Sequence, residues 1–179
     1  MFASFVQGPL VRVIPLGLIL LALQRTIFVE IQVGGVIIQI MMAMAAAAGV
    51  AGGSERGAIV GFTLGVMFDL AEGTPLGSTA TAMTIAGVVG GLLALIAADP
   101  HWWLEAIFTA LGTAVGVAMI PLVRVFIGES EPFQRQLGVV LGVVAAAAAV
   151  MSPLLVPLAR WCLRMRRPEW KQPVGESTP

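Results

Sequence analysis

Few side chains in this sequence could take part in chemistry. Asp69 sits near the end of an otherwise apolar stretch, and His101 and Cys162 are the single histidine and the single cysteine. Proteolysis inside a membrane needs a serine with a histidine base. His101 lies in a loop beside two tryptophans and has no serine motif to serve. Cys162 has no second cysteine with which to form an internal disulfide.

The acidic side chains do not form a metal or phosphate site either. Such sites gather carboxylates, histidines or cysteines, whereas the ten acidic residues here are scattered over loops and chain ends. Glu129 and Glu131 form the densest pair, and beside Pro132 they are expected to solvate a loop. No glycine-rich loop ends in a lysine, as a phosphate cradle would. The sequence therefore predicts no catalytic residue, no metal ligand, no cofactor and no enzyme.

The composition indicates which solvent surrounds these residues. Of the 179 residues 58% are hydrophobic and only 11% are charged, with a mean hydropathy of +0.96. A water-soluble domain needs more polar surface to cover its core, so lipid must surround most of this chain. The formal net charge is zero, and no global charge points to a nucleic-acid partner.

Six apolar runs are candidates for membrane-spanning helices, each of which needs about 20 residues. The third run is the weakest, because charged residues shorten its apolar part. We predict an all-α polytopic membrane protein, a six-helix transmembrane bundle over residues 1–162, followed by a basic and then disordered cytoplasmic tail over 163–179. The runs cover residues 10–29, 33–52, 55–71, 77–98, 102–127 and 135–160.

Basic residues predict the orientation of this bundle. A cluster of arginine and lysine at the C-terminal end of the last run and beyond it marks the cytoplasmic side, and six spans place the N-terminus on the same side. Trp102, Trp103 and Trp161 would then lie together at the inner interface. Five spans would instead turn the N-terminus outward. The cluster consists of Arg160, Arg164, Arg166, Arg167 and Lys171.

Glycines at four-residue spacing predict how the helices pack. Four residues turn a helix by about 400°, so such a stripe drifts only about 40° per step and stays on one face. Membrane helices associate where small residues let their backbones approach. A high glycine content of membrane helices in general is the alternative explanation. The stripe consists of Gly53, Gly57, Gly61 and Gly65, and further pairs are Gly112 with Gly116 and Gly138 with Gly142.

Asp69 continues the four-glycine stripe and has two candidate roles. Its carboxylate could cap the backbone amides of the turn EGTPLG, residues 72–77. Alternatively it could pair with Arg25 or Arg124, which we place at the same outer end of the bundle. Gln39, which is expected to bond to a neighbouring helix, and scattered threonines are too few polar groups for a proton or ion pathway.

Residues 57–93, GAIVGFTLGVMFDLAEGTPLGSTATAMTIAGVVGGLL, resemble the MreD family of rod shape-determining membrane proteins in bacteria. Chain length and the number of spans are also similar to that family. The second run departs from it, because the Pro-Asp pair often seen there is missing. The matching positions are Gly57, Gly61, Phe62, Gly65, Asp69, Gly73, Pro75, Leu76 and Gly77.

The resemblance implies a non-enzymatic subunit of the cell-elongation (rod) complex in the bacterial cytoplasmic membrane, with both termini cytoplasmic. It implies an MreC-like partner with one membrane span, with further links to RodA, a class B penicillin-binding protein, the MreB filament and peptidoglycan synthesis. We expect the partner's helix to dock, amid membrane lipid, on one of two glycine faces. One face carries Gly57, Gly61, Phe62 and Gly65, and the other carries Gly112 and Gly116.

The family is also similar in fold to the substrate-binding subunits of energy-coupling-factor vitamin transporters. This gives an alternative function, the binding of a small molecule for transport. Such a subunit needs polar and aromatic groups that converge on a cavity, and the sequence offers few of them.

Overall fold

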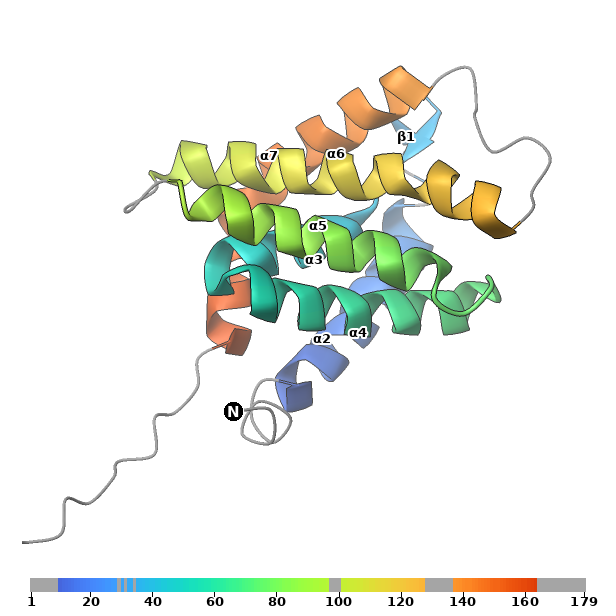
Figure 1. The fold of residues 1–179 in the computed structure, drawn as a ribbon, viewed down its shortest axis with the longest axis horizontal. Helices are drawn as coiled ribbons and strands as arrows, with labels where there is room; N and C mark the ends of the chain where they lie inside the picture. The colour runs from blue at the N-terminus through green and yellow to red at the C-terminus, as the bar shows by residue number, and fades with distance from the viewer. Residues whose placement is uncertain are drawn as a thin grey trace, which may run out of the picture.

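The computed structural model describes residues 10–28, 30, 32–33, 35–96, 101–127 and 137–163. Within these ranges the chain is an all-helical bundle of six α-helices, with one π-helical turn and one two-stranded sheet, which confirms the predicted all-α class (Figure 1). The elements in chain order are α2 (Leu10–Leu23), the π-helix η1 (Gln24–Phe28), β1 (Gln32–Val33), β2 (Val36–Ile37), α3 (Ile40–Gly52), α4 (Ser54–Glu72), α5 (Ser78–Ala94), α6 (Trp102–Ile127) and α7 (Leu137–Leu163).

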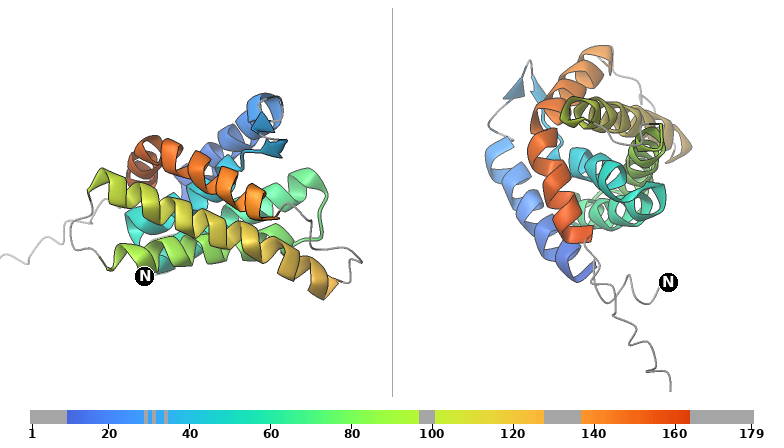
Figure 2. Two further views of the ribbon diagram at one scale, coloured as in Figure 1. Left: turned by 90° about the horizontal axis from the view of Figure 1, so that it is seen from above. Right: turned by 90° about the vertical axis from the view of Figure 1, so that its left-hand side faces the viewer.

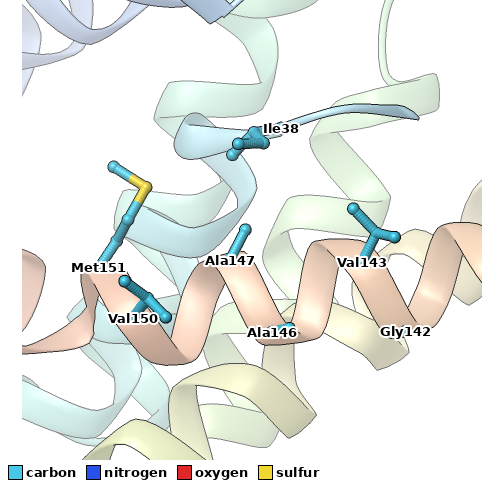
Figure 3. Close-up of a pocket in the computed structure, with 7 residues that line it drawn as sticks. All are labelled: Ile38, Gly142, Val143, Ala146, Ala147, Val150 and Met151. Carbon is cyan, nitrogen blue, oxygen red and sulfur yellow. The ribbon is translucent and has the colours of Figure 1, made fainter. Parts of the chain in front are cut away.

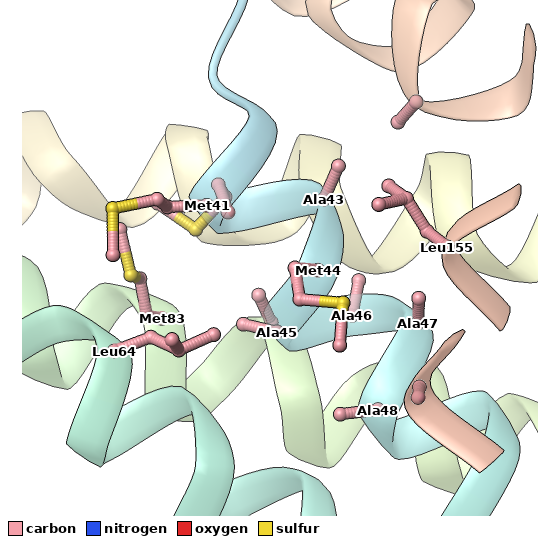
Figure 4. Close-up of a cluster of buried hydrophobic side chains, with 14 of the residues drawn as sticks. Met41, Ala43, Met44, Ala45, Ala46, Ala47, Ala48, Leu64, Met83 and Leu155 are labelled. Atoms are coloured by element: carbon pink, nitrogen blue, oxygen red, sulfur yellow. The ribbon is translucent and has the colours of Figure 1, made fainter. Parts of the chain in front are cut away.

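Helix α3 forms the centre of the bundle. Residues 40–50 are all buried, and α4, α5, α6 and α7 all pack against this helix. Alanine and glycine make up most of its sequence, so neighbours can approach it from every side. Figure 2 shows α4, α5 and α6 around one side of α3 and α7 across the other. Larger side chains fill the space between the alanines in Figure 4, namely Met41, Met44, Leu64, Met83 and Leu155.

The second apolar run, predicted as one helix over 33–52, is only partly helical. Its first residues form a hairpin in which Val33 pairs with Val36, and Gly35 in the turn has φ +78°. β-Branched residues favour a pleated strand, and a Gly-Gly pair favours a two-residue hairpin turn. The helix that remains has 13 residues, or about 20 Å, against about 30 Å of hydrocarbon. The short helix is therefore α3, whereas α4, the third run, has 19 residues.

Two of the described helices are long and apolar enough to cross a membrane. They are Trp102–Val123 within α6, with a mean hydropathy of 2.1, and Leu137–Leu163, with 2.5. Helices α3 and α5 are apolar but shorter, and α4 carries acidic residues at both ends. These lengths indicate association with a membrane, while the six-span topology stays a prediction.

Contacts between helices define two ends of the bundle. At one end Arg12 of α2 donates a hydrogen bond to the carbonyl oxygen of Trp161 in α7, at 3.3 Å. The Arg12 guanidinium also lies 5.5 Å from the centre of the Trp161 ring. At the opposite end Arg25 of η1 lies 3.3 Å from the carboxylate of Glu72 in α4. The first end corresponds to the predicted cytoplasmic side, and α7 ends there at Leu163, so the predicted tail lies outside the described residues.

Candidate functional site

Asp69 lies in the last turn of α4, and its carboxylate caps the beginning of α5. The residue is 1% exposed. Its Oδ2 accepts hydrogen bonds from the backbone amides of Gly77, at 2.9 Å, and Ala80, at 3.3 Å. Its Oδ1 accepts from the amide of Thr79, at 3.1 Å, and from the hydroxyl of Thr74, at 2.9 Å. The negative charge thus lies where the first amides of α5 have no partner within their own helix.

The turn between α4 and α5 depends on two glycines with left-handed backbone. Gly73, at φ +69°, ends α4 and donates its amide to the carbonyl oxygen of Asp69, at 3.0 Å. Gly77, at φ +98°, is the N-cap residue just before α5. Ser78 donates its amide to the carbonyl oxygen of Pro75, at 3.1 Å, and places its hydroxyl 3.5 Å from the Asp69 carboxylate. The motif that carries the family resemblance therefore builds this turn, on which Leu76 is 71% exposed.

Arg25 pairs with Glu72 rather than with Asp69. Its Nη1 lies 3.3 Å from Oε1 of Glu72 and donates a hydrogen bond to the carbonyl oxygen of Ala71, at 2.8 Å. Of the two roles open to Asp69, the structure has the capping role, because the buried carboxylate already accepts from amides and hydroxyls. Arg124 belongs to α6, but its side chain lies outside what the structure describes.

The glycine face of α4 is filled by α5. Gly57, Gly61 and Gly65 are buried. A Cβ added to Gly61 would collide with the carbonyl oxygen of Met83, and one added to Gly57 would lie 2.5 Å from the carbonyl oxygen of Gly87. The two backbones are therefore in direct contact, and no room is left for a partner's helix on this face.

Two predicted members of the α4 face lie elsewhere. Gly53 has φ +87° and separates α3 from α4, so it interrupts the helix instead of beginning the stripe. Phe62 is 53% exposed, away from the buried glycines of its helix.

The second predicted docking face, on α6, is filled as well. A Cβ on Gly112 would lie 3.0 Å from the carbonyl oxygen of Ala86 in α5 and 3.1 Å from Cβ of Ala46 in α3. A Cβ on Gly116 would lie 2.7 Å from both Cβ of Ala86 and Sδ of Met42. The prediction that one of these two faces is open to a partner is therefore wrong, because each lies against helices of the same chain.

One face of helix α7 keeps small residues exposed, whereas Ala148 and Ser152 on another face are buried. A Cβ on Gly138 or Gly142 would meet nothing within 4 Å, and Val150 is 81% exposed. Together with Ile38, which follows β2, this face forms an apolar groove of about 560 Å³, shown in Figure 3. We call it the α7 groove, and it is lined by Ile38, Gly142, Val143, Ala146, Ala147, Val150 and Met151.

A second hollow, near Asp69, is lined by polar and apolar side chains. It measures about 250 Å³ and lies where η1, the beginning of α3, the end of α4, the beginning of α5 and α6 meet. Gln39 lines it, and its side chain makes no hydrogen bond with a described residue, contrary to the expectation that it bonds to a neighbouring helix. We call it the polar cavity, lined on its polar side by Gln24, Gln39, Glu72, Thr74 and Thr79.

Polar side chains also join α6 to α7 at the predicted cytoplasmic end. Glu105 is 8% exposed and forms an ion pair with Arg160, and the hydroxyls of Thr109 and Ser152 lie 3.4 Å apart. Thr113 bonds back to the carbonyl oxygen of Thr109, at 2.7 Å. The sequence alone does not predict the Glu105–Arg160 pair, because the two residues are 55 positions apart.

The remaining candidates for chemistry stand apart from one another. Within the described ranges, no three histidine, cysteine, aspartate or glutamate residues are close enough to share a metal ion. His101 is exposed just before α6, Cys162 is buried in α7, and Glu129 and Glu131 lie outside the described residues. Comparisons of the chain with family models, curated proteins and solved structures found no match.

Proposed function

We propose that this chain is a non-enzymatic, multi-pass subunit of the bacterial cell-elongation complex that binds an MreC-like single-span protein. In that complex it would support the control of peptidoglycan synthesis by RodA and a class B penicillin-binding protein along MreB. Residues 57–93 support this family, because they carry the MreD-like pattern. One structural observation supports the location of the partner site: the α7 groove is a face of small residues that the described helices leave uncovered.

The α7 groove suits a membrane helix for physical reasons. Lipid tails are as apolar as leucine, so two helices gain by close backbone contact and not by hydrophobicity alone. Gly142 and Ala146 offer such contact, and only 28% of the apolar window of α7 is buried inside the bundle. The faces of α4 and α6 lack this opening, because α5 and α3 already occupy them.

Crosslinking of single cysteines tests the partner site. In a Cys162→Ala background, Gly142→Cys or Ala146→Cys is produced together with an MreC-like protein that carries one cysteine in its span. We expect disulfide capture from both positions. Leu70→Cys is the matched control, because Leu70 is 67% exposed on α4, a helix that contributes no residue to the α7 groove.

A bulky replacement provides the complementary test. Gly142→Leu projects into open space and should leave the fold intact while it abolishes co-purification with the MreC-like protein. Capture from Leu70→Cys alone, or full co-purification of Gly142→Leu, contradicts the α7 groove as the docking face.

The alternative function, a substrate-binding subunit of a vitamin transporter, is favoured by the polar cavity. Thermal denaturation of the purified protein with and without vitamins separates it from the first proposal. A raised midpoint with one vitamin, together with no capture of an MreC-like protein, would favour the transporter role.

A further inference from the structure

Gln24 is a buried amide with a spare donor. The residue is 6% exposed, and its Oε1 accepts a hydrogen bond from the backbone amide of Met41, at 3.2 Å. A backbone amide can only donate, so Gln24 must turn its oxygen toward Met41 and its NH₂ group away. No described residue accepts a hydrogen bond from that NH₂ group. Among the described residues, every side-chain nitrogen or oxygen that is fully enclosed has a hydrogen-bond partner. The NH₂ group of Gln24 therefore borders open space, and Gln24 lines the polar cavity.

The end of the cavity at Gln24 favours a ligand group that accepts hydrogen bonds or carries negative charge. Gln24 and Gln39 both lie at the beginning of α3, where the helix dipole is positive and the first amides lack partners within the helix. Gln24 also belongs to a π-helical turn, a geometry that is frequent at functional sites. A ligand acceptor placed here would receive hydrogen bonds from the side-chain NH₂ groups of Gln24 and Gln39.

The other polar groups of the cavity mainly accept. Glu72 contributes a carboxylate that is 34% exposed, and Arg25 lies near one of its oxygens. Thr74 donates its hydroxyl proton to Asp69, so only its lone pairs remain for a ligand. A ligand group at this end must therefore donate, and an ammonium would also match the charge of Glu72.

Apolar side chains complete the lining. Phe68 lines the cavity from α4, Met83 from α5 and Ile120 from α6. The volume of about 250 Å³ corresponds to about eight water molecules at roughly 30 Å³ each. A compact organic molecule with a flat or apolar body fits this space.

We infer that the polar cavity binds a small dipolar organic molecule. Its carboxylate or carbonyl group meets the NH₂ group of Gln24, its ammonium or amine group meets Glu72 and Thr74, and its apolar body lies against Phe68. This inference names the ligand chemistry of the cavity that favours the alternative function. It does not rest on the docking of a partner helix, because the α7 groove and the polar cavity share no residue.

Three related probes test the inference on the purified full chain in detergent micelles. 4-(Aminomethyl)benzoate carries both groups on one ring, whereas benzylammonium and 4-methylbenzoate each carry one. Binding is measured by isothermal titration calorimetry and ligand-observed NMR. We expect saturable binding of 4-(aminomethyl)benzoate in the millimolar range and about tenfold weaker binding of each single-group probe.

Three variants locate the binding. Glu72→Gln should weaken the two ammonium probes about tenfold and leave 4-methylbenzoate unchanged. Glu55→Gln is the matched control, because Glu55 is an exposed acid in the first turn of the same helix, and it should change nothing. Ile120→Phe fills the cavity and should abolish the binding of all three probes. If that variant does not fold, Gln39→Leu replaces it and should weaken only the two carboxylate probes.

Absence of saturable binding by all three probes would overturn the inference. Equal effects of Glu72→Gln and Glu55→Gln would place the binding at the micelle surface and overturn it too. Neither result bears on crosslinking at the α7 groove, so the two proposals succeed or fail separately.

Discussion

Replacement of Asp69 by asparagine is the most direct test of the cap that joins α4 to α5. Asparagine has nearly the same shape, but an NH₂ group takes the place of one carboxylate oxygen and cannot accept a hydrogen bond. Both carboxylate oxygens of Asp69 accept from backbone amides of α5, so either orientation of the new side chain leaves at least one amide unpaired.

The two orientations differ in their consequences. With the NH₂ group at the Oδ2 position, the amides of Gly77 and Ala80 both lose their acceptor. With the NH₂ group at the Oδ1 position, only the amide of Thr79 loses its acceptor. The hydroxyls of Thr74 and Ser78 can rotate and accept a hydrogen bond from the NH₂ group instead. One unpaired buried donor costs about 1–3 kcal/mol. Loss of the charge at the beginning of α5 adds about 0.3–1 kcal/mol. We therefore expect Asp69→Asn to lower the free energy of unfolding by about 2–3 kcal/mol.

Unfolding in mixed micelles by titration with sodium dodecyl sulfate measures this loss, and hydrogen exchange at the Thr79 amide reports the local effect. Asp69→Ala removes every acceptor and should cost more than Asp69→Asn. Arg25→Gln is the second arm of a double-mutant cycle. Its effect should add to that of Asp69→Asn, because Arg25 contacts Glu72 and Ala71 instead. Wild-type stability of Asp69→Asn, or strong non-additivity with Arg25→Gln, would refute the capping role.

Two further changes test the packing and the second cap. Gly61→Leu should force α4 and α5 apart and cost at least about 1–3 kcal/mol, whereas Gly142→Leu on the open face of α7 should stay within about 0.5 kcal/mol of wild type in the same titration. Equal losses would show that the two glycine faces do not differ. Gln24→Leu leaves the backbone amide of Met41 without its acceptor and should lower the free energy of unfolding by about 1–2 kcal/mol. Hydrogen exchange at the Met41 amide should become faster, and unchanged exchange there would contradict the capping role of Gln24.

Four-residue glycine spacing predicted a close-packed face on α4, and Gly57, Gly61 and Gly65 do form one. The spacing could not identify the helix that covers this face. Every helix in this chain carries small residues, so α5 and a helix of another protein are equally compatible with the stripe. The choice is made by the turn after Asp69, which folds α5 back along α4.

The hairpin before α3 and the polar cavity cannot be predicted from the sequence, for different reasons. A short apolar run is compatible with a strand or a helix, so the sequence does not separate residues 33–39 from the helix that follows them. The cavity gathers side chains from four helical elements and the loops between them, and Gln24 and Glu72 are unremarkable within their own segments. Only the fold brings them to one point.

The short length of α3 explains why a polar cavity exists in so apolar a bundle. A helix of 13 residues that begins inside the protein must have its first amides satisfied by side chains, because lipid offers no partner. Gln24 supplies its oxygen to Met41 for this purpose, and its NH₂ group is left over because an amide side chain carries both functions. Asp69 meets the same requirement for α5 but leaves no donor, because a carboxylate only accepts. The difference between these two caps places an unused donor at the beginning of α3 and makes that end of the bundle able to bind a polar molecule.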